Sequence, residues 1–313
     1  MVISDYLSRE ELKAFRTPSH PKAIWQVVVN YGIIAGAFAL FAPWPNPLTF
    51  IASSFILGGR ILGLAILNHD AGHGGLFKSG RFSRNISRWL FTGPILGDYE
   101  GYRKGHMKHH KYAGTIDDPD IPFVKEYPVC AASMRRKFTR DLTGQTGFRD
   151  LLYLIKSSTF EKRLPFLVWH GAVMAGLYLA GALWAYPLWW VAFVFCYPII
   201  LRIRVMGEHG NVADILDSDA RNNTRTTLAN LLERLLISPN FVNYHCEHHV
   251  LPAVPGHNLP RLHRLLTSRG FYADHPHAVV KGYWKVVKNC VGERHDRHDF
   301  GNKRGDASYA NMS

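Results

Sequence analysis

Two long segments of the chain contain no acidic or basic side chain. Residues 23–59 and 164–201 lack Asp, Glu, Lys and Arg throughout. Because about 20 helical residues cross a bilayer, each segment is too long for one crossing and suits two crossings joined by a short turn. The Pro-rich sequence at 43–47 and the aromatic sequence at 184–187 are typical of chain reversals at a lipid interface. The pattern therefore predicts two helical hairpins.

The hairpins predict an all-α polytopic membrane protein with four transmembrane helices. A soluble protein with two buried hairpins is the alternative, but the cluster of Trp184, Trp189 and Trp190 at one hairpin end favours a membrane interface. The hairpins span about 24–68 and 165–207, with helices at about 24–42, 48–68, 165–183 and 187–207.

The distribution of basic residues predicts the orientation. Residues 1–22 hold four Lys or Arg, residues 74–164 hold 17 and residues 202–313 hold 15, whereas the two hairpin turns hold none. By the positive-inside rule, both termini and the central segment are cytoplasmic. We expect an integral protein of a bacterial inner membrane. Its single domain of residues 1–313 would have a cytoplasmic helical cap, residues 74–164 and 208–298, and a polar tail, residues 299–313.

Composition narrows the classes of protein further. With 47% hydrophobic and 19% charged residues, the chain is too apolar for disorder and too polar for a pure membrane bundle. The net charge of +13 fits an anionic membrane face, and no basic-aromatic module indicates nucleic-acid binding. The four cysteines form no C-x-x-C pair, which argues against a disulfide framework and a zinc ribbon.

The histidines form three clusters. The chain holds 17 histidines in 313 residues, and the pattern H-x-x-H-H occurs twice, although about 0.05 occurrences per chain are expected by chance. On a helix, positions i, i+3 and i+4 share one face, so each cluster aims its imidazoles in one direction. The clusters are His69 and His73; His106, His109 and His110; and His245, His248 and His249.

Eight imidazoles exceed the capacity of one metal ion, so the clusters predict a two-metal site. Imidazole suits iron, zinc, copper and nickel. A helix over residues 48–73 would be about 39 Å long and would project beyond a hydrocarbon core of about 30 Å. His69 and His73 then lie beneath the membrane surface, and the fourth helix brings His209 to the same side as a ninth candidate ligand.

The three clusters, in this order with two hairpins, resemble the histidine boxes of the membrane fatty acid desaturase superfamily, over about residues 23–263. The segment from Asn243 to His249, with Pro252 and Pro255 following, is similar to the third box of the bacterial fatty-acid and sphingolipid desaturase branches. The resemblance implies two iron ions. Their implied ligands are His69, His73, His106, His109, His110, His209, His245, His248 and His249.

The chain departs from other branches of the superfamily at three points. Animal acyl-CoA desaturases have Asn where this chain has Val205, which leaves the acyl carrier open. Front-end desaturases usually begin the third box with Gln, and this chain has His245. No His-Pro-Gly-Gly signature of a fused cytochrome b5 is present, so electrons are expected from a separate ferredoxin or cytochrome b5 type donor.

The implied activity is O2-dependent desaturation of a lipid acyl chain, because an unactivated methylene has no acidic proton and requires activated oxygen. Hydroxylation or ketolation of a lipid or carotenoid on the same irons remains an alternative. A two-zinc membrane hydrolase and a non-enzymatic membrane metal-binding or receptor protein are the rival classes.

Two further groups of side chains are candidates. Polar residues next to the histidines could orient ligand rings through the second ring nitrogen, or could be structural: Asp70, Glu208, Asn243 and Glu247. Arg221 and Arg225 could hold a phosphate or carboxylate head group of the substrate, or could form a solvated face.

Overall fold

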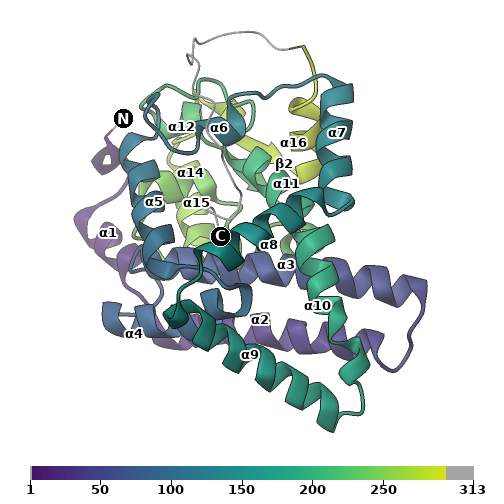
Figure 1. Ribbon diagram of the computed structural model, residues 1–313. Coiled ribbons are helices and arrows are strands. Elements are labelled where there is room, and N and C mark those ends of the chain that lie inside the picture. Colours follow the sequence, from purple (N-terminus) through teal and green to yellow (C-terminus); the bar gives the residue numbers. More distant parts are fainter. Residues whose placement is uncertain (1, 294–313) are drawn as a thin grey trace.

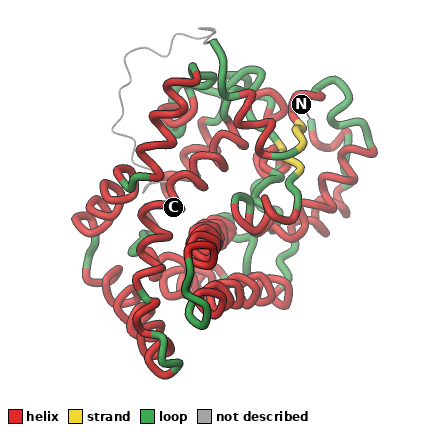
Figure 2. The backbone as a smooth tube through the Cα atoms, turned by 90° about the vertical axis from the view of Figure 1, so that its right-hand side faces the viewer, coloured by secondary structure: helices red, strands yellow, loops and turns green. Residues whose placement is uncertain are grey.

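The computed structural model describes residues 2–293, so the predicted polar tail 299–313 lies outside the described residues. Helix dominates this range (Figure 2). Its strands are β1 (Thr226–Leu228) and β2 (Val279–Lys281), which pair in parallel. The expectation of an all-α chain missed this pair, because three-residue strands have too little alternation to be recognised in sequence.

Two long helices, α2 (His20–Phe41) and α3 (Pro47–Gly72), lie side by side and run in opposite directions (Figure 1). Asn46 caps the second helix, because its side-chain oxygen accepts hydrogen bonds from the backbone N–H groups of Leu48 and Thr49 at 3.0 and 3.1 Å. Pro47 follows at the first helical position, where no N–H is needed. The reversal therefore falls at the predicted Pro-rich turn.

The environments of these two helices differ. The side of α2 that carries Ile24, Trp25 and Val28 is exposed, with Trp25 66% exposed. Exposed apolar side chains along a whole helix are typical of a surface that contacts lipid. In contrast, α3 is buried on all sides from Leu57 to Gly72 and forms the centre of the molecule.

Three helices in residues 2–293 are long and apolar enough to cross a membrane: His20–Phe41, Pro47–Gly72 and Leu183–His209. The third consists of a 3-10 turn (Leu183–Ala185), α10 (Pro187–Val191), a π-helical turn (Ala192–Cys196) and α11 (Tyr197–His209).

The sequence predicts a fourth span at 165–183, where the structure has α9 (Phe160–Leu179). Its first turn carries Glu161, Lys162 and Arg163, which shortens the apolar part of the helix. The chain reverses at Gly181, which has φ 67°, a conformation suited to glycine. The reversal thus begins before the predicted aromatic turn at 184–187.

The remaining elements are mostly short helices, and most lie on one side of α2 and α3 (Figure 1). The α-helices are α1 (Arg9–Arg16), α4 (Gly80–Ile86), α5 (Tyr99–Tyr112), α6 (Ile121–Val124), α7 (Ala131–Leu142), α8 (Gln145–Ser157), α12 (Ala220–Asn223), α13 (Leu231–Leu236), α14 (His245–Val250), α15 (Leu259–Ser268) and α16 (Tyr283–Asn289). A π-helical turn (Ser87–Thr92) and 3-10 turns (Ile3–Asp5, Gly93–Ile95, Pro239–Phe241, Gly256–Asn258 and Pro276–Ala278) complete the set.

A buried ion pair joins α11 to α7. The Arg202 guanidinium donates from Nε and Nη2 to the Asp141 carboxylate at 2.5 and 2.9 Å. Asp141 is fully buried and also accepts a hydrogen bond of 2.7 Å from the Thr146 hydroxyl. Because both charges are removed from water, loss of either partner would leave an unpaired buried charge and would strongly destabilise the fold.

We predict that Arg202→Met lowers the free energy of unfolding by about 3–5 kcal/mol, because it leaves a carboxylate buried without its cation. Thermal unfolding of the detergent-solubilised protein measures the effect. The control is Arg84→Met, at the exposed 2.8 Å pair with Glu100, which should cost about 1 kcal/mol or less. Equal melting temperatures for the two variants would contradict the assignment.

Candidate metal centre

Four segments bring the clustered histidines together. His69 lies in the last turn of α3 and His73 caps its C-terminus, which agrees with the predicted extent of a helix over residues 48–73. The second cluster lies on α5, whose N-terminus is capped by the Asp98 side chain. The third cluster lies on α14, and His209 is the last residue of α11.

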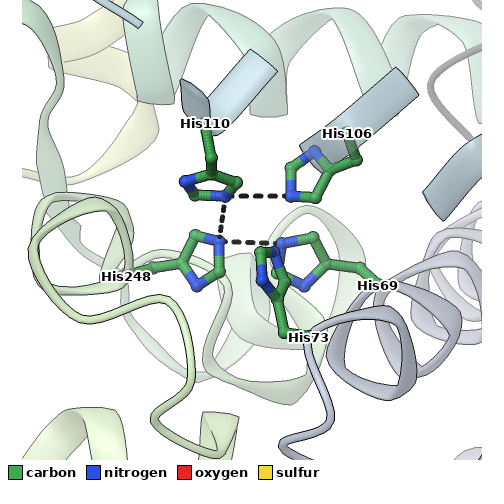
Figure 3. A group of neighbouring side chains, drawn as sticks. All are labelled: His69, His73, His106, His110 and His248. Atoms are coloured by element: carbon green, nitrogen blue, oxygen red, sulfur yellow. Dashed lines mark hydrogen bonds between the residues drawn. The ribbon is translucent and has the colours of Figure 1, made fainter. Parts of the chain in front are cut away.

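The first histidine group combines residues from α3, α5 and α14. Its ligand nitrogens all lie within 4.8 Å of one another. Nε2 of His248 lies 3.0 Å from Nε2 of His69 and 2.9 Å from Nε2 of His110, as Figure 3 shows. Nε2 of His73 is buried without a hydrogen-bond partner. The five members are His69, His73, His106, His110 and His248.

The second histidine group combines residues from α5, α11 and α14. Its members are His109, His209, His245 and His249, again with ligand nitrogens within 4.8 Å of one another. Nε2 of His245 lies 2.9 Å from Nε2 of His209, and Nε2 of His109 lies 3.2 Å from Nε2 of His249. All nine histidines singled out in the sequence therefore meet, five in one group and four in the other.

Hydrogen bonds at the second ring nitrogen define the tautomer of three rings. Nδ1 of His69 lies 2.9 Å from the Asp70 carboxylate, Nδ1 of His109 lies 2.7 Å from the Asp118 carboxylate, and Nδ1 of His209 lies 2.9 Å from the backbone carbonyl of Asn223. A proton on Nδ1 that donates to an oxygen leaves Nε2 with a free lone pair. The Nε2 atoms of all three rings point into the two groups.

The geometry fits a cation in each group. Free lone pairs about 3 Å apart repel one another, whereas a positive ion between them would turn the repulsion into attraction. With metal–imidazole bonds of about 2.1 Å, two ligands at a right angle place their nitrogens about 3.0 Å apart. The measured 2.9–3.2 Å separations match this value.

Burial keeps most of these rings neutral and able to bind a metal. It lowers the pKa of His110 to about 2 and the pKa values of His106, His245 and His248 well below the ordinary value. His109 differs, because the charges of Asp120 and Asp118 overcome the effect of burial and raise its pKa to about 9. The same negative charge would strengthen this imidazole as a metal ligand.

Two of the four polar neighbours predicted from sequence lie beside a histidine of the two groups. Asp70 contacts His69, and Glu208 lies 3.5 Å from Nδ1 of His245 while it also pairs with Arg204. Asn243 instead donates to the carbonyl of Thr227 at 2.9 Å, which ties the start of α14 to β1.

Glu247 anchors α14 from the side opposite the histidines. The hydroxyl groups of Thr226 and Tyr272 donate to its carboxylate, and Nδ1 of His263 lies 2.5 Å from it. The expectation that Asn243 and Glu247 orient ligand rings directly does not fit these contacts. Both residues hold the six-residue helix that carries three of the histidines.

Sequence reasoning missed three partners of the histidines: Asp118 and Asp120, which both lie beside His109, and the carbonyl of Asn223. The signal for Asp118 was present, because Asp117, Asp118 and Asp120 are concentrated shortly after the second cluster in an otherwise basic segment. A backbone carbonyl leaves no trace in sequence.

The two arginines proposed for a head group are engaged elsewhere. Arg225 is 4% exposed, and its guanidinium donates to the carbonyls of Met206, Gly210 and Asn211 at the end of α11. Arg221 pairs with Asp219 at 2.6 Å and donates to the Phe271 carbonyl. The head-group expectation does not fit Arg225, because a guanidinium buried against a helix end has no access to lipid.

The fold combines three apolar helices of membrane-spanning length with two converging histidine groups that are suited to metal binding. Residues 44–282 match the profile of the fatty acid desaturase family, and the chain belongs to this family. It is therefore an enzyme, an oxidoreductase of lipid metabolism.

The chain is similar to relatives with different reactions. It is 26% identical over 275 residues to dihydrorhizobitoxine desaturase of Bradyrhizobium elkanii, covering 79% of this chain and 75% of that protein. It is 30% identical over 270 residues to a beta-carotene ketolase of Paracoccus sp., covering 80% and 96%. It is 27% identical over 252 residues to a sphingolipid delta(4)-desaturase/C4-monooxygenase of Homo sapiens, covering 75% and 71%.

We predict that Asp118→Asn weakens divalent metal binding at the second group by about 10–100-fold, because the His109 ring loses the closer of its two carboxylate partners. Metal content, measured by mass spectrometry over a series of free metal concentrations, reports the change. Asp117→Asn is the matched control, since this neighbouring carboxylate is exposed. The same loss in both variants would refute a specific role for Asp118.

Proposed function

We propose that the protein is an O2-dependent di-iron desaturase that introduces a double bond into a lipid acyl chain. The observation that carries this proposal is the convergence of nine imidazoles, five in one group and four in the other, within a member of the fatty acid desaturase family. When bound, the two iron ions would activate O2, the oxidant needed to remove hydrogen from an unactivated methylene. The nine histidines would hold the irons.

The side chains around the histidines have two tasks in this proposal. Asp70 and Asp118 hold rings in the tautomer that presents Nε2, and Glu247 ties α14 to Thr226 of β1 and to Tyr272. The histidine side chains lie in a largely buried space, with His69 and His109 each 2% exposed. Exclusion of water there protects a strongly oxidising centre from side reactions.

A second candidate function is oxygen insertion, giving a ketone or an alcohol on a lipid or carotenoid. Its support is the beta-carotene ketolase relative, which this chain matches along 96% of that protein's length. Electrons would come in either case from a separate ferredoxin or cytochrome b5 type protein. A ferredoxin-dependent acyl-lipid desaturase of Synechocystis is similar over 36% of this chain.

The proposed setting is a bacterial inner membrane with four crossings in a single domain. In this topology α9 completes the second hairpin, and its exposed Leu167, Tyr178 and Leu179 contact lipid. Both termini, the segment 74–164 and the histidine groups then face the cytoplasm, in agreement with the basic residues.

The decisive measurement combines metal and product. Protein purified without oxygen should contain about two irons per chain, and membranes of an expressing strain should contain a lipid that lacks two hydrogens. A lipid or carotenoid that gains oxygen would favour the second candidate.

His209→Ala should abolish the product and lower iron content, because it removes one of four ligands of the second group. An unchanged product would contradict this role.

A natural cysteine tests the topology. Cys130 is exposed, whereas Cys196, Cys246 and Cys290 are buried. We predict that a membrane-impermeant maleimide labels Cys130 in inside-out vesicles and not in intact spheroplasts. Asn46→Cys in a Cys130→Ser background is the control and should show the opposite pattern. Labelling of Cys130 from outside would overturn the proposed orientation.

A further inference from the structure

Helix α5 carries a row of lysines on the side opposite its histidines. Lys104, Lys108 and Lys111 are all exposed, at spacings of four and three residues. At about 100° per residue, the three lysines fall within about 60° of one another, and the centre of the three histidines lies about 180° away. One helix therefore separates a basic face from the two histidine groups.

The lysine face has no carboxylate partner within the described residues. None of the three ammonium groups forms an ion pair there, and the carboxylates at the start of α5 are engaged elsewhere. Glu100 pairs with Arg84 at 2.8 Å, and Asp98 pairs with Lys162 at 2.9 Å. Lys111 lies 5.1 Å from the centre of the Tyr112 ring, so the face presents three unneutralised positive charges and an aromatic edge.

The composition of this face argues for an aqueous partner and against a lipid surface. A helix that lies on a membrane combines basic residues with exposed apolar side chains that enter the lipid. The segment at Phe82 and Trp89, which are 46% and 43% exposed among basic residues, has that composition. No large hydrophobic residue of α5 is comparably exposed.

We propose that the lysine face of α5 is the docking surface for an acidic, one-electron carrier protein. This inference rests on the proposed function and deepens it by assigning the place of electron delivery. Positive and negative surfaces steer association and orient the partners. A helix with its side chains is about 10–12 Å across, so the surface of a carrier docked here would lie about one helix diameter from His106, His109 and His110.

Electron balance explains why such a surface is needed. Reduction of O2 to two molecules of water takes four electrons. Desaturation supplies two of them from the two C–H bonds that break. The carrier supplies the other two, one at each of two dockings, and two protons come from water. Each docking leaves the carrier oxidised by one electron and the metal pair reduced by one.

The experiment uses the full-length, metal-loaded protein in nanodiscs and a plant-type [2Fe–2S] ferredoxin, an acidic carrier, as the probe. The test variant is Lys104→Glu/Lys108→Glu/Lys111→Glu. The matched control is Lys281→Glu/Lys285→Glu/Lys288→Glu, which reverses three exposed lysines with the same spacing on β2 and α16, two elements that carry no histidine of the two groups. Both variants carry the same change in net charge.

Two readouts are compared at low ionic strength. The affinity for oxidised ferredoxin needs no turnover, and stopped-flow reoxidation of reduced ferredoxin reports electron transfer. We expect the α5 variant to lose about tenfold or more in both, with a weaker dependence on salt. The control should stay within about twofold. Unchanged metal content and unchanged reduction by a small uncharged reductant show that the α5 variant is folded.

The outcomes separate the docking proposal from the proposed function. If wild-type protein accepts electrons from ferredoxin and both triple variants do so equally well, the docking surface is refuted and the enzyme assignment stands. If the α5 variant is impaired only in nanodiscs with anionic lipid, the face contacts the membrane and the proposal is also refuted. Wild-type protein that binds no metal and consumes no electrons would refute the proposed function, while the affinity comparison still tests the docking surface.

Discussion

The structure depends on holding nine imidazole rings in two small, largely buried groups. Ring nitrogens 2.9–3.2 Å apart repel one another wherever both present a lone pair, so the surrounding protein must supply the free energy that keeps them in place. Charged and carbonyl oxygens at Nδ1 fix three of the rings. A site prepared in this way needs little rearrangement to accept cations, which favours binding.

The helices that carry the rings are fixed by interactions outside the site. The centrally buried α3 provides a rigid base for His69 and His73. The short α14 could not hold three histidines by its own helical stability, and the buried contacts of Glu247 with Thr226, His263 and Tyr272 compensate for this. Buried polar contacts therefore hold the helices that carry the histidines in place. The pair of Arg202 and Asp141 has the same role between α11 and α7.

Basic residues serve different purposes in different parts of the protein. Arg225 neutralises carbonyl dipoles at the end of α11, and Arg202 balances a buried carboxylate. The exposed lysines of α5 have neither task within the described residues. The net charge of +13 thus includes buried arginines that stabilise the fold as well as exposed basic residues. Only the exposed residues can guide a partner protein.

The features that depend on residues near one another in the chain could be predicted from the sequence. Uncharged runs located the segments that hold three apolar helices of membrane-spanning length. Histidine spacing identified eight residues that share a centre, because helical periodicity places such residues on one face, and the predicted end of the fourth helix added His209. The sequence could not divide them between the two groups. His109 and His110 are neighbours on α5 yet belong to different groups, as do His248 and His249 on α14. Adjacent helical residues point about 100° apart, and only the packing of α3, α11 and α14 around α5 decides what each one meets. The same packing pairs Asp118 with His109 and buries Arg225, since contacts between distant segments depend on the three-dimensional arrangement of the helices.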